Sequence, residues 1–507
     1  MAEEIELKLT TSAEVLPEVR AHPAVAAVAR GRAKTTRMVS TYYDTPGRDL
    51  AAAGVALRLR RAGGRWLQTV KGAGNAAAGL HARAEFEWPL AAPRIDPEKL
   101  ARTPWRELFA RNGAYRRVFA TDVERSEQPL AFADGTRATL CLDVGEIRAG
   151  KRRAPVSEIE VELQAGDPSR LFELASALAA DLPVRVCHAS KAERGYALAT
   201  QEAPAPRRAR ETALAPDATP QAALAAIAAD CIAQIETNAA GVLAATRDPE
   251  YLHQVRVGWR RTRSLLKLAR LIVPAERIDP LEQQLRALGA ALGPARDADV
   301  FALETLPKVA AQFRGDREIV RLRLRAAARR RRASKLAREA LASPQFQRSL
   351  LALGAFFASL ARSPADAATQ ALARDWIRPV LDVRHRKLRK RARHAHRVGA
   401  AERHRARIAA KKLRYAAEFF APLFPGKRTH AYVAALSKLQ SALGRLNDLE
   451  VAKTLVDELA PKDGVDPAAA HAGGVVRGWL AASLAPDLKR LRDAQRAFRK
   501  CTPYWET

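Results

Sequence analysis

Acidic and basic side chains alternate with apolar residues in several short segments of the first 200 residues. The residues spaced two apart are Glu4, Glu6 and Lys8; Arg58 and Arg60; Arg83, Glu85 and Glu87; and Glu158, Glu160 and Glu162. Residues two apart on a β-strand point to the same face. Glutamates can hold a hard divalent cation, and arginines and lysines can bind phosphate oxygens. Together they suit metal-assisted hydrolysis of a phosphoanhydride.

Spacing alone leaves two interpretations of these charged faces open. A strand with alternating charges is usually a solvent-exposed face, because charged side chains are rarely buried. An antiparallel sheet closed into a barrel would instead turn several such faces toward one interior. Charges in an interior are costly unless they are paired or bind a ligand or metal. The second interpretation therefore predicts an internal polar site.

A cationic pattern in the second half of the chain occurs twice, 151 residues apart. The two sets, called the basic stripes below, are His253, Arg256, Arg260 and Arg263, and His404, Arg407, Lys411 and Arg414. A second motif, residues 292–297, reappears at the same offset as residues 443–448, which indicates duplication of a structural unit. On a helix this spacing places each set along one side over about 15 Å. Two such stripes are expected to hold a large anion.

The elements that must position these residues differ between the two halves. Residues 1–200 have strand alternation, with helical stretches near 12–29 and 168–180, and residues 201–220 are an Ala- and Pro-rich linker. Residues 221–507 have helical periodicity interrupted by prolines such as Pro274 and Pro294. We expect an α+β multidomain protein whose helical part divides into halves of about 221–370 and 371–507.

The net charge of +31 is concentrated in the helical half of the chain. Residues 251–507 carry 52 basic and 23 acidic residues, whereas residues 1–250 carry 34 and 32. This distribution predicts a polyanionic partner: nucleic acid, an anionic membrane surface or polymeric phosphate. The four scattered cysteines and the absence of an apolar run of roughly 20 residues lead us to expect a cytoplasmic protein without a membrane span.

A further dense basic run, residues 384–397, is expected to contribute to the same anion site. Its candidate residues are Arg386, Arg389 and Arg393. Aromatic residues make up only 6% of the chain, which disfavours single-stranded nucleic acid because such sites usually stack bases on aromatic rings. Double-stranded nucleic acid needs no aromatic residues and stays open, and nonspecific binding at low salt is expected of any such basic surface.

The N-terminal motifs, in their order, resemble the CYTH or triphosphate tunnel metalloenzyme superfamily. They are Glu4-Ile5-Glu6-Leu7-Lys8, Tyr42-Tyr43-Asp44-Thr45, Arg58-Leu59-Arg60, Thr69-Val70-Lys71-Gly72, residues 81–87, residues 158–163 and residues 190–196. The resemblance implies an eight-stranded antiparallel tunnel that binds a triphosphate and one or two divalent metals, Mg²⁺ or Mn²⁺. It implies metal ligation by Glu4, Glu6, Glu160 and Glu162, and phosphate binding by Lys8, Arg58, Arg60, Lys71, Arg83 and Lys191. Glu85 and Glu87 complete the implied catalytic set with Glu4, Glu6 and Lys8.

The helical half resembles the CHAD domain, a conserved histidine α-helical module. The resemblance rests on the two basic stripes and on Leu292-Gly293 with Arg296-Asp297 and Leu443-Gly444 with Asn447-Asp448. It implies two pseudo-symmetric four-helix bundles, inorganic polyphosphate as the ligand, and association with polyphosphate granules. The second copy has lysine at 411 and 412, where charge is kept and the bidentate guanidinium is lost.

We therefore expect a metal-dependent inorganic triphosphatase joined to a polyphosphate-binding module. The alternatives are a noncatalytic granule scaffold, or a nucleotide or thiamine triphosphatase or adenylyl cyclase of the same superfamily.

Overall fold

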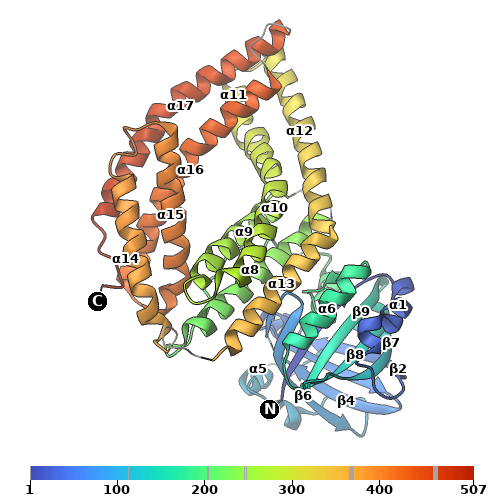
Figure 1. The fold of residues 1–507 in the computed structure, drawn as a ribbon. Helices are drawn as coiled ribbons and strands as arrows, with labels where there is room; N and C mark the ends of the chain where they lie inside the picture. Colours follow the sequence, from blue (N-terminus) through green and yellow to red (C-terminus); the bar gives the residue numbers. More distant parts are fainter. Residues whose placement is uncertain are drawn as a thin grey trace. The chain divides into compact units, whose positions relative to one another are not determined.

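The computed structural model describes residues 2–72, 74–111, 114–202, 205–244, 246, 248–364, 370–460 and 466–506. Its N-terminal part is an antiparallel β-barrel (Figure 1). The strands are β1 (Ala2–Thr10), β2 (Lys34–Asp44), β3 (Ala56–Ala62), β4 (Arg65–Lys71), β5 (Asn75–Ala77), β6 (Leu80–Leu90), β7 (Arg116–Ala131), β8 (Arg137–Ala149), β9 (Arg152–Ala165) and β10 (Arg185–Val186). The four sets of charged residues spaced two apart lie within β1, β3, β6 and β9.

Eight of the strands close the barrel. Their order is β1-β9-β8-β7-β2-β3-β4-β6, and β6 pairs in turn with β1, while β5 and β10 are short additions on β6 and β1. The expected eight-stranded antiparallel tunnel is thus confirmed. Alternation along β3 shows how it is built, because Leu57 and Leu59 are buried in the outer core while Arg58 and Arg60 point to the opposite, inner face.

Short helices accompany the strands of the barrel. They are α1 (Leu16–Ala21), α2 (Pro23–Ala26), α3 (Asp49–Ala52), α4 (Pro97–Ala101), α5 (Arg106–Arg111), α6 (Ser169–Asp181) and α7 (Lys191–Thr200). Leu57, Val70 and Phe109 belong to an apolar core on the outside of the barrel, beneath α3 to α5. Tyr42, Phe119 and Val123 belong to a second apolar cluster on the inner face, where Tyr42 is directly opposite Arg58 and Phe119 and residues of α7 pack against it. The outer face is therefore apolar, and the inner face has a charged part and an apolar part that packs against α7.

The rest of the described chain is helical. Its helices are α8 (Pro220–Leu243), α9 (Glu250–Ala269), α10 (Ala275–Asp299), α11 (Leu306–Gln312), α12 (Arg317–Ala342), α13 (Pro344–Arg362), α14 (Ala373–Ala392), α15 (Ala400–Phe420), α16 (Lys427–Leu459) and α17 (Pro467–Arg499). Among the described residues, no helix combines the length and apolar character that crossing a bilayer requires.

One expected helix break is wrong. Pro274 precedes α10 as predicted, but α10 continues through Pro294 to Asp299. Buried Leu292 and Ala295 lie on either side of this proline, so packing of the helix outweighs the hydrogen bond that proline cannot donate. The arrangement of the helices as two four-helix bundles stays a prediction.

The chain divides into two compact units. The first contains residues 1–207 together with residues 232–244 of the α8 region and residues 343–359, most of α13. The second contains residues 208–231, 245–342 and 360–507. Residues 205–219 of the expected linker lie outside the helices and strands, and residues 203–204 of it lie outside the described residues. The proposed domain boundaries stay a prediction.

Candidate active site

The interior of the barrel contains a cavity of about 680 Å³. Every tunnel residue expected from the sequence lines it: Glu4, Glu6, Lys8, Arg58, Arg60, Lys71, Arg83, Glu85, Glu87, Glu160, Glu162 and Lys191. Of the two interpretations of the charged strands, the structure thus favours a shared interior. A cavity lined by carboxylates, ammonium groups and guanidinium groups can bind cations and phosphates side by side.

Ion pairs hold the carboxylates of β1 in place. The Nζ atom of Lys71 lies 2.7 and 2.9 Å from the two carboxylate oxygens of Glu4, and Arg83 Nη2 lies 2.5 Å from Glu6 Oε1. Lys8 Nζ lies 3.0 Å from the same Glu6 oxygen. Burial raises the pKa of Glu6, but Lys8 and Arg83 outweigh it, so this pKa lies below its ordinary value.

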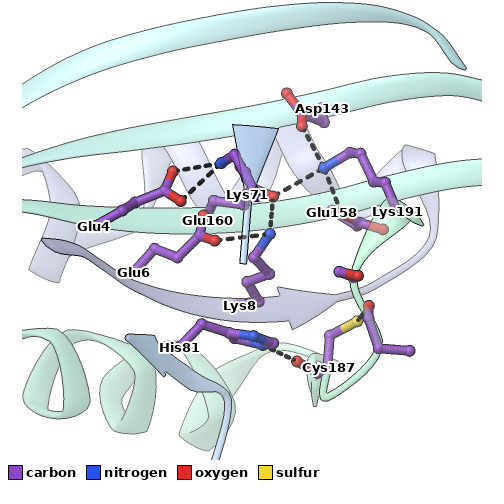
Figure 2. A network of polar contacts seen from close by, with 12 residues as sticks. Glu4, Glu6, Lys8, Lys71, His81, Asp143, Glu158, Glu160, Cys187 and Lys191 are labelled. Carbon is purple, nitrogen blue, oxygen red and sulfur yellow. Dashed lines mark hydrogen bonds and ion pairs between the residues drawn. The ribbon is translucent and has the colours of Figure 1, made fainter. Parts of the chain in front are cut away.

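Glu160 is the centre of the densest part of the network (Figure 2). Its Oε1 accepts hydrogen bonds from Lys8 Nζ at 2.8 Å and from Lys191 Nζ at 2.9 Å, and Arg125 contacts its other oxygen. Burial opposes ionisation, yet Lys191, Lys8 and Arg125 hold the pKa of Glu160 well below its ordinary value. Glu160 is therefore a carboxylate although it is buried.

Arg60, Glu87 and Glu162 line the cavity and have no ion-pair partner within 4 Å among the described residues. The guanidinium of Arg60 has a 3.3 Å contact to Ser40, and burial with nearby Arg58 and Arg125 lowers its pKa to about 10. Burial and nearby Glu4 raise the pKa of Glu162. The cavity therefore retains an unpaired cation, which favours phosphate, and an unpaired carboxylate, which favours a metal cation.

The second unit has a site of different character, where the two basic stripes meet. Arg256 and Arg260 on α9 lie near Arg407 and Lys411 on α15. Burial and the nearby Arg260, Arg296 and Arg407 lower the pKa of Arg256 to about 10, although Asp297 acts in the opposite direction. Burial, Arg407 and Arg260 lower the pKa of Lys411 to about 7. The Nε atoms of Arg256, Arg260 and Arg407 are buried without a hydrogen-bond partner. Such a cluster of like charges with free donors is suited to a multivalent anion.

The second duplicated motif supplies the acids of this cluster. Asp297 on α10 favours the charged form of Arg256, and Asp448 on α16 does the same for Arg407. These two pairs are related by the 151-residue offset of the sequence repeat. His404 also lies within hydrogen-bonding distance of its α16 neighbour, since Nδ1 is 3.3 Å from Asn447 Oδ1. The repeat is therefore present in the placement of these charges as well as in the sequence.

Comparisons with known proteins agree with both parts of this description. A family model described as the CYTH domain matches residues 2–196, and one described as the CHAD domain matches residues 226–457. The chain contains a CYTH domain followed by a CHAD domain. The N-terminal barrel is the CYTH domain, and the basic stripes lie in the CHAD domain.

Two relatives are informative. The chain is 31% identical over 206 residues to the inorganic triphosphatase of Haemophilus influenzae, a match that covers 40% of this chain and 56% of that protein. The chain thus spans little more than half the length of this curated relative. The crystal structure of the CHAD domain from the plant Ricinus communis shares 38% identity, covering 58% of this chain and 97% of that one, with a TM-score of 0.50.

Sequence reasoning missed part of the CYTH network. Arg125 on β7 forms a bidentate pair with Asp143 on β8 at 2.6 and 2.7 Å, and Lys191 contacts Asp143 and Glu158 at 2.7 and 2.5 Å. Arg125 and Glu127 are two residues apart, so the spacing rule used elsewhere could have found them. Asp143 is a single acid within an apolar run and gives no such signal.

The acidic residues of the CYTH domain fit a divalent cation. Oxygen atoms of Asp143, Glu158 and Glu160 lie within 4.8 Å of one another, and carboxylates are the donors such cations prefer. Asp143 and Glu158 are already paired with Lys191, however. Glu162 is directly opposite Glu6 in the pairing of β9 with β1 and lacks a basic partner among the described residues. Glu4, Glu6 and Glu160 of the expected ligand set are paired with basic residues as well, so this ligand set stays a prediction.

The CHAD residues expected from sequence are not all brought together. Arg414 lies 3.2 Å from Glu418, so its charge is partly compensated. Arg386, Arg389 and Arg393 are exposed. The residues of α14 that contact α15 are instead Arg384, which donates to Lys412 O at 2.9 Å, and Arg391, which donates to Arg405 O at 3.4 Å, while Lys387 lies near enough to Lys412 to lower its pKa. A role in binding for the three exposed arginines stays a prediction.

Proposed function

We propose that the CYTH domain hydrolyses inorganic triphosphate with a divalent metal, Mg²⁺ or Mn²⁺, and that the CHAD domain binds inorganic polyphosphate. The observation that carries the first part is the barrel cavity, where carboxylates and phosphate-binding cations line one space and Arg60 and Glu162 lack partners of opposite charge among the described residues. The similarity to an inorganic triphosphatase supports this choice of substrate.

In this proposal the basic side chains bind the substrate. Arg58, Arg60, Lys71, Arg83, Lys8 and Lys191 contact phosphate oxygens and neutralise the charge that develops on the leaving phosphate. Phosphate binding exchanges internal ion pairs for ion pairs with substrate, because most of these cations contact a glutamate in the free protein. Arg60 has no ion pair to break among the described residues, so it can bind phosphate without such an exchange.

The acidic side chains hold the metal. Glu4, Glu6, Glu160 and Glu162 are the proposed ligands, and the metal supplies Lewis-acid polarisation of the phosphate and activation of water. Glu85 lies 3.0 Å from Lys71 and 3.5 Å from Arg58, and Glu87 accepts a hydrogen bond from Thr69 at 2.9 Å. Glu85 therefore orients two phosphate-binding cations, and Glu87 completes the acidic wall.

Phosphate release from tripolyphosphate by the full chain, with Mg²⁺ or Mn²⁺, tests the proposed activity. Replacing both Glu4 and Glu6 with glutamine removes two proposed ligands. We expect the rate to fall by at least about 100-fold, because substitutions behind a metal ligand alone cost about 10- to 100-fold. Glu124→Gln, at an exposed position of β7, is the matched control and should leave the rate unchanged. A normal rate in the double variant would refute the assignment.

The same assay separates the proposed activity from its alternatives. Thiamine triphosphate and ATP are tested beside tripolyphosphate, with cyclic AMP as a separate product to be measured from ATP. Preference for tripolyphosphate supports the proposal, and formation of cyclic AMP would favour a cyclase. A chain that binds polyphosphate and releases no phosphate from any of these compounds would be a scaffold.

The proposed CHAD ligand is a chain of phosphates. Arg256, Arg260, Arg407 and Lys411 present buried or partly buried cations from two helices, with Asp297 and Asp448 as the nearby acids. Phosphates without bases suit this surface, since the aromatic residues of the stripes, Trp259 and Tyr415, are buried. We also propose a cytoplasmic location with association to polyphosphate granules, for which imaging of the tagged full chain is the test.

A further inference from the structure

The unit that contains the CYTH barrel includes helical segments beyond the CYTH match. Residues 232–244 and residues 343–359 belong to this unit, although the CYTH match ends at residue 196. The longer segment is most of α13, and the first contains the end of α8. The barrel is therefore completed by helices that come from the CHAD part of the sequence.

Gln347 on α13 holds the edge strand β10. Its side chain is buried, and Oε1 accepts a hydrogen bond from the backbone N–H of Val186 at 3.0 Å. Val186 pairs with Leu9 of β1, and the next residue, Cys187, donates its N–H to the backbone oxygen of Lys8 at 3.0 Å. Gln347 is thus two hydrogen bonds away from the backbone of Lys8.

Gly354, two helical turns further along α13, packs against the segment that accepts a hydrogen bond from the backbone N–H of Lys8. The backbone N–H of Lys8 donates to Gly79 at 2.8 Å, and Gly79 follows the buried Ala78. A Cβ on Gly354 would lie 2.4 Å from the Cβ of Ala78 and 2.5 Å from the ring of Phe172, so only glycine permits this contact. The backbone N–H and C=O of Lys8 are therefore each hydrogen-bonded to a segment that α13 contacts.

The segment that Gln347 contacts, residues 185–188, also continues directly into Lys191, the second lysine that contacts Glu160. His188 Nδ1 lies 3.3 Å from the buried Glu236 Oε2 on α8, which gives this segment another helical contact. Two residues later, Ser190 caps α7 by exchanging hydrogen bonds with Glu193, and Lys191 is the first residue of that helix. Lys8 and Lys191 then meet at one oxygen of Glu160.

We propose that Gln347 is a positioning residue for triphosphate hydrolysis, holding residues 185–188 so that Lys8 and Lys191 are placed correctly around Glu160. This inference rests on the proposed function of the CYTH domain. It assigns to α13, a helix within the CHAD match, a role in the geometry of the barrel cavity. The barrel alone, cut after residue 200, lacks this support.

The test replaces Gln347 in the full chain. Gln347→Leu keeps the size of the side chain and removes the acceptor for Val186 N–H, whereas Gln347→Glu keeps an acceptor oxygen. Arg348→Ala, at an exposed position on the same helix, is the control. Hydrogen exchange of residues 185–191 is measured by mass spectrometry, and KM and kcat are measured with tripolyphosphate.

We expect faster exchange in residues 185–191 of Gln347→Leu. We also expect kcat/KM to fall about 10- to 100-fold, the usual cost of losing a group that orients site residues. KM should rise, which a smaller folded fraction cannot cause, because unfolded molecules lower only the apparent kcat. Gln347→Glu should restore both quantities toward wild type. Gly354→Ala should act in the same direction through the Gly79 side of Lys8.

Two results would overturn the inference. One is unchanged exchange in residues 185–191 of Gln347→Leu, and the other is faster exchange with KM and kcat as in wild type. Where Gln347→Leu gives too little folded protein, Gln347→Asn takes its place, because it shortens the side chain and keeps its polarity. A wild-type chain that releases no phosphate refutes the proposed function, whereas an active wild type beside an unaffected variant refutes this inference alone.

Discussion

The CYTH cavity and the CHAD stripes both gather cations, but they compensate them differently. In the cavity, Lys8, Lys71, Arg83, Arg125 and Lys191 each contact at least one carboxylate. In the CHAD cluster, Arg256, Arg260, Arg407 and Lys411 have no carboxylate within 4 Å among the described residues, and they lie near one another with Asp297 and Asp448 as more distant acids. The first arrangement is stable when empty and must rearrange to bind, whereas the second is repulsive when empty and gains directly from an anion.

The two arrangements suit two different kinds of phosphate binding. A site of internal ion pairs can bind a metal and a phosphate together, because each takes over one half of a pair. A site of like charges has affinity for any multivalent anion and little need of a metal. Substitutions that remove cations should therefore destabilise the CYTH domain more than the CHAD domain.

The largest expected effect is the loss of polyphosphate binding when the central CHAD cations are neutralised. The variant combines Arg256→Gln, Arg260→Gln, Arg407→Gln and Lys411→Met. Hydrogen bonds to charged groups contribute about 1.5–3 kcal/mol each, so binding should fall below detection by calorimetry with long-chain polyphosphate. Hydrolysis of tripolyphosphate should stay at the wild-type rate.

A control with three other charges removed makes this result specific. Arg386, Arg389 and Arg393 are exposed, and all three are replaced with glutamine. We expect only a few-fold loss of polyphosphate affinity, as for the removal of exposed charges. Equal losses in the two variants would mean that net charge, and not the meeting of the two stripes, decides binding.

The next effect is on stability and concerns Arg125. Removing one partner of a buried ion pair costs about 3–5 kcal/mol, because the other charge stays buried without compensation. We expect the free energy of unfolding of Arg125→Met to fall by an amount near the lower end of this range, because Lys191 still contacts both Asp143 and Glu160. Hydrogen exchange of β8 in increasing urea measures the loss for the CYTH domain separately.

The matched substitution in the CHAD domain is Arg256→Met. Burial and the nearby Arg260, Arg296 and Arg407 disfavour its charge, and Asp297 alone among the main influences favours it. Its loss should change the free energy of unfolding, measured on α9 in the same way, by less than about 1 kcal/mol. A loss as large as that of Arg125→Met would contradict the comparison between the two domains.

The smallest expected effect is a pH dependence of polyphosphate affinity. Burial, Arg407 and Arg260 lower the pKa of Lys411 to about 7, and a bound anion raises this pKa again. The contribution of Lys411 is therefore complete below pH 7 and decreases above it, by up to about tenfold per pH unit. Affinity measured between pH 6 and 9 should fall in wild type. Lys411→Arg, which stays charged, should remove this part of the slope, and an identical slope in both proteins would contradict the assignment.

The sequence predicted the barrel and its charged faces well because alternation is a local property. Glu4, Glu6, Glu160 and Glu162 could be found from spacing within one strand. Asp143 could not, because its meeting with Arg125 and Glu158 depends on the register of β8 with β7 and β9. Register between long strands is set by the whole sheet and not by a short motif.

Helical faces show the same limit in the CHAD domain. The 3- and 4-residue spacings correctly placed Arg256 and Arg260 on one side of α9, because that relation is internal to a helix. The choice of Arg386, Arg389 and Arg393 required knowledge of which side of α14 faces α15. Arg384, Lys387 and Arg391 have the same spacing type and lie on that side. Spacing shows which residues share one side of a helix, but the packing of the helices decides which side faces the neighbouring helix.

The closed order of the eight strands fixes the width of the CYTH tunnel. Each strand of the ring is hydrogen-bonded to two neighbours, since β6 also pairs with β1. A ligand too wide for the tunnel would have to separate two strands and lose backbone hydrogen bonds, at about 1 kcal/mol for each. For the proposed activity, the closed ring of strands should therefore favour slender, unbranched phosphate chains over substrates with bulky groups beside the reacting phosphate.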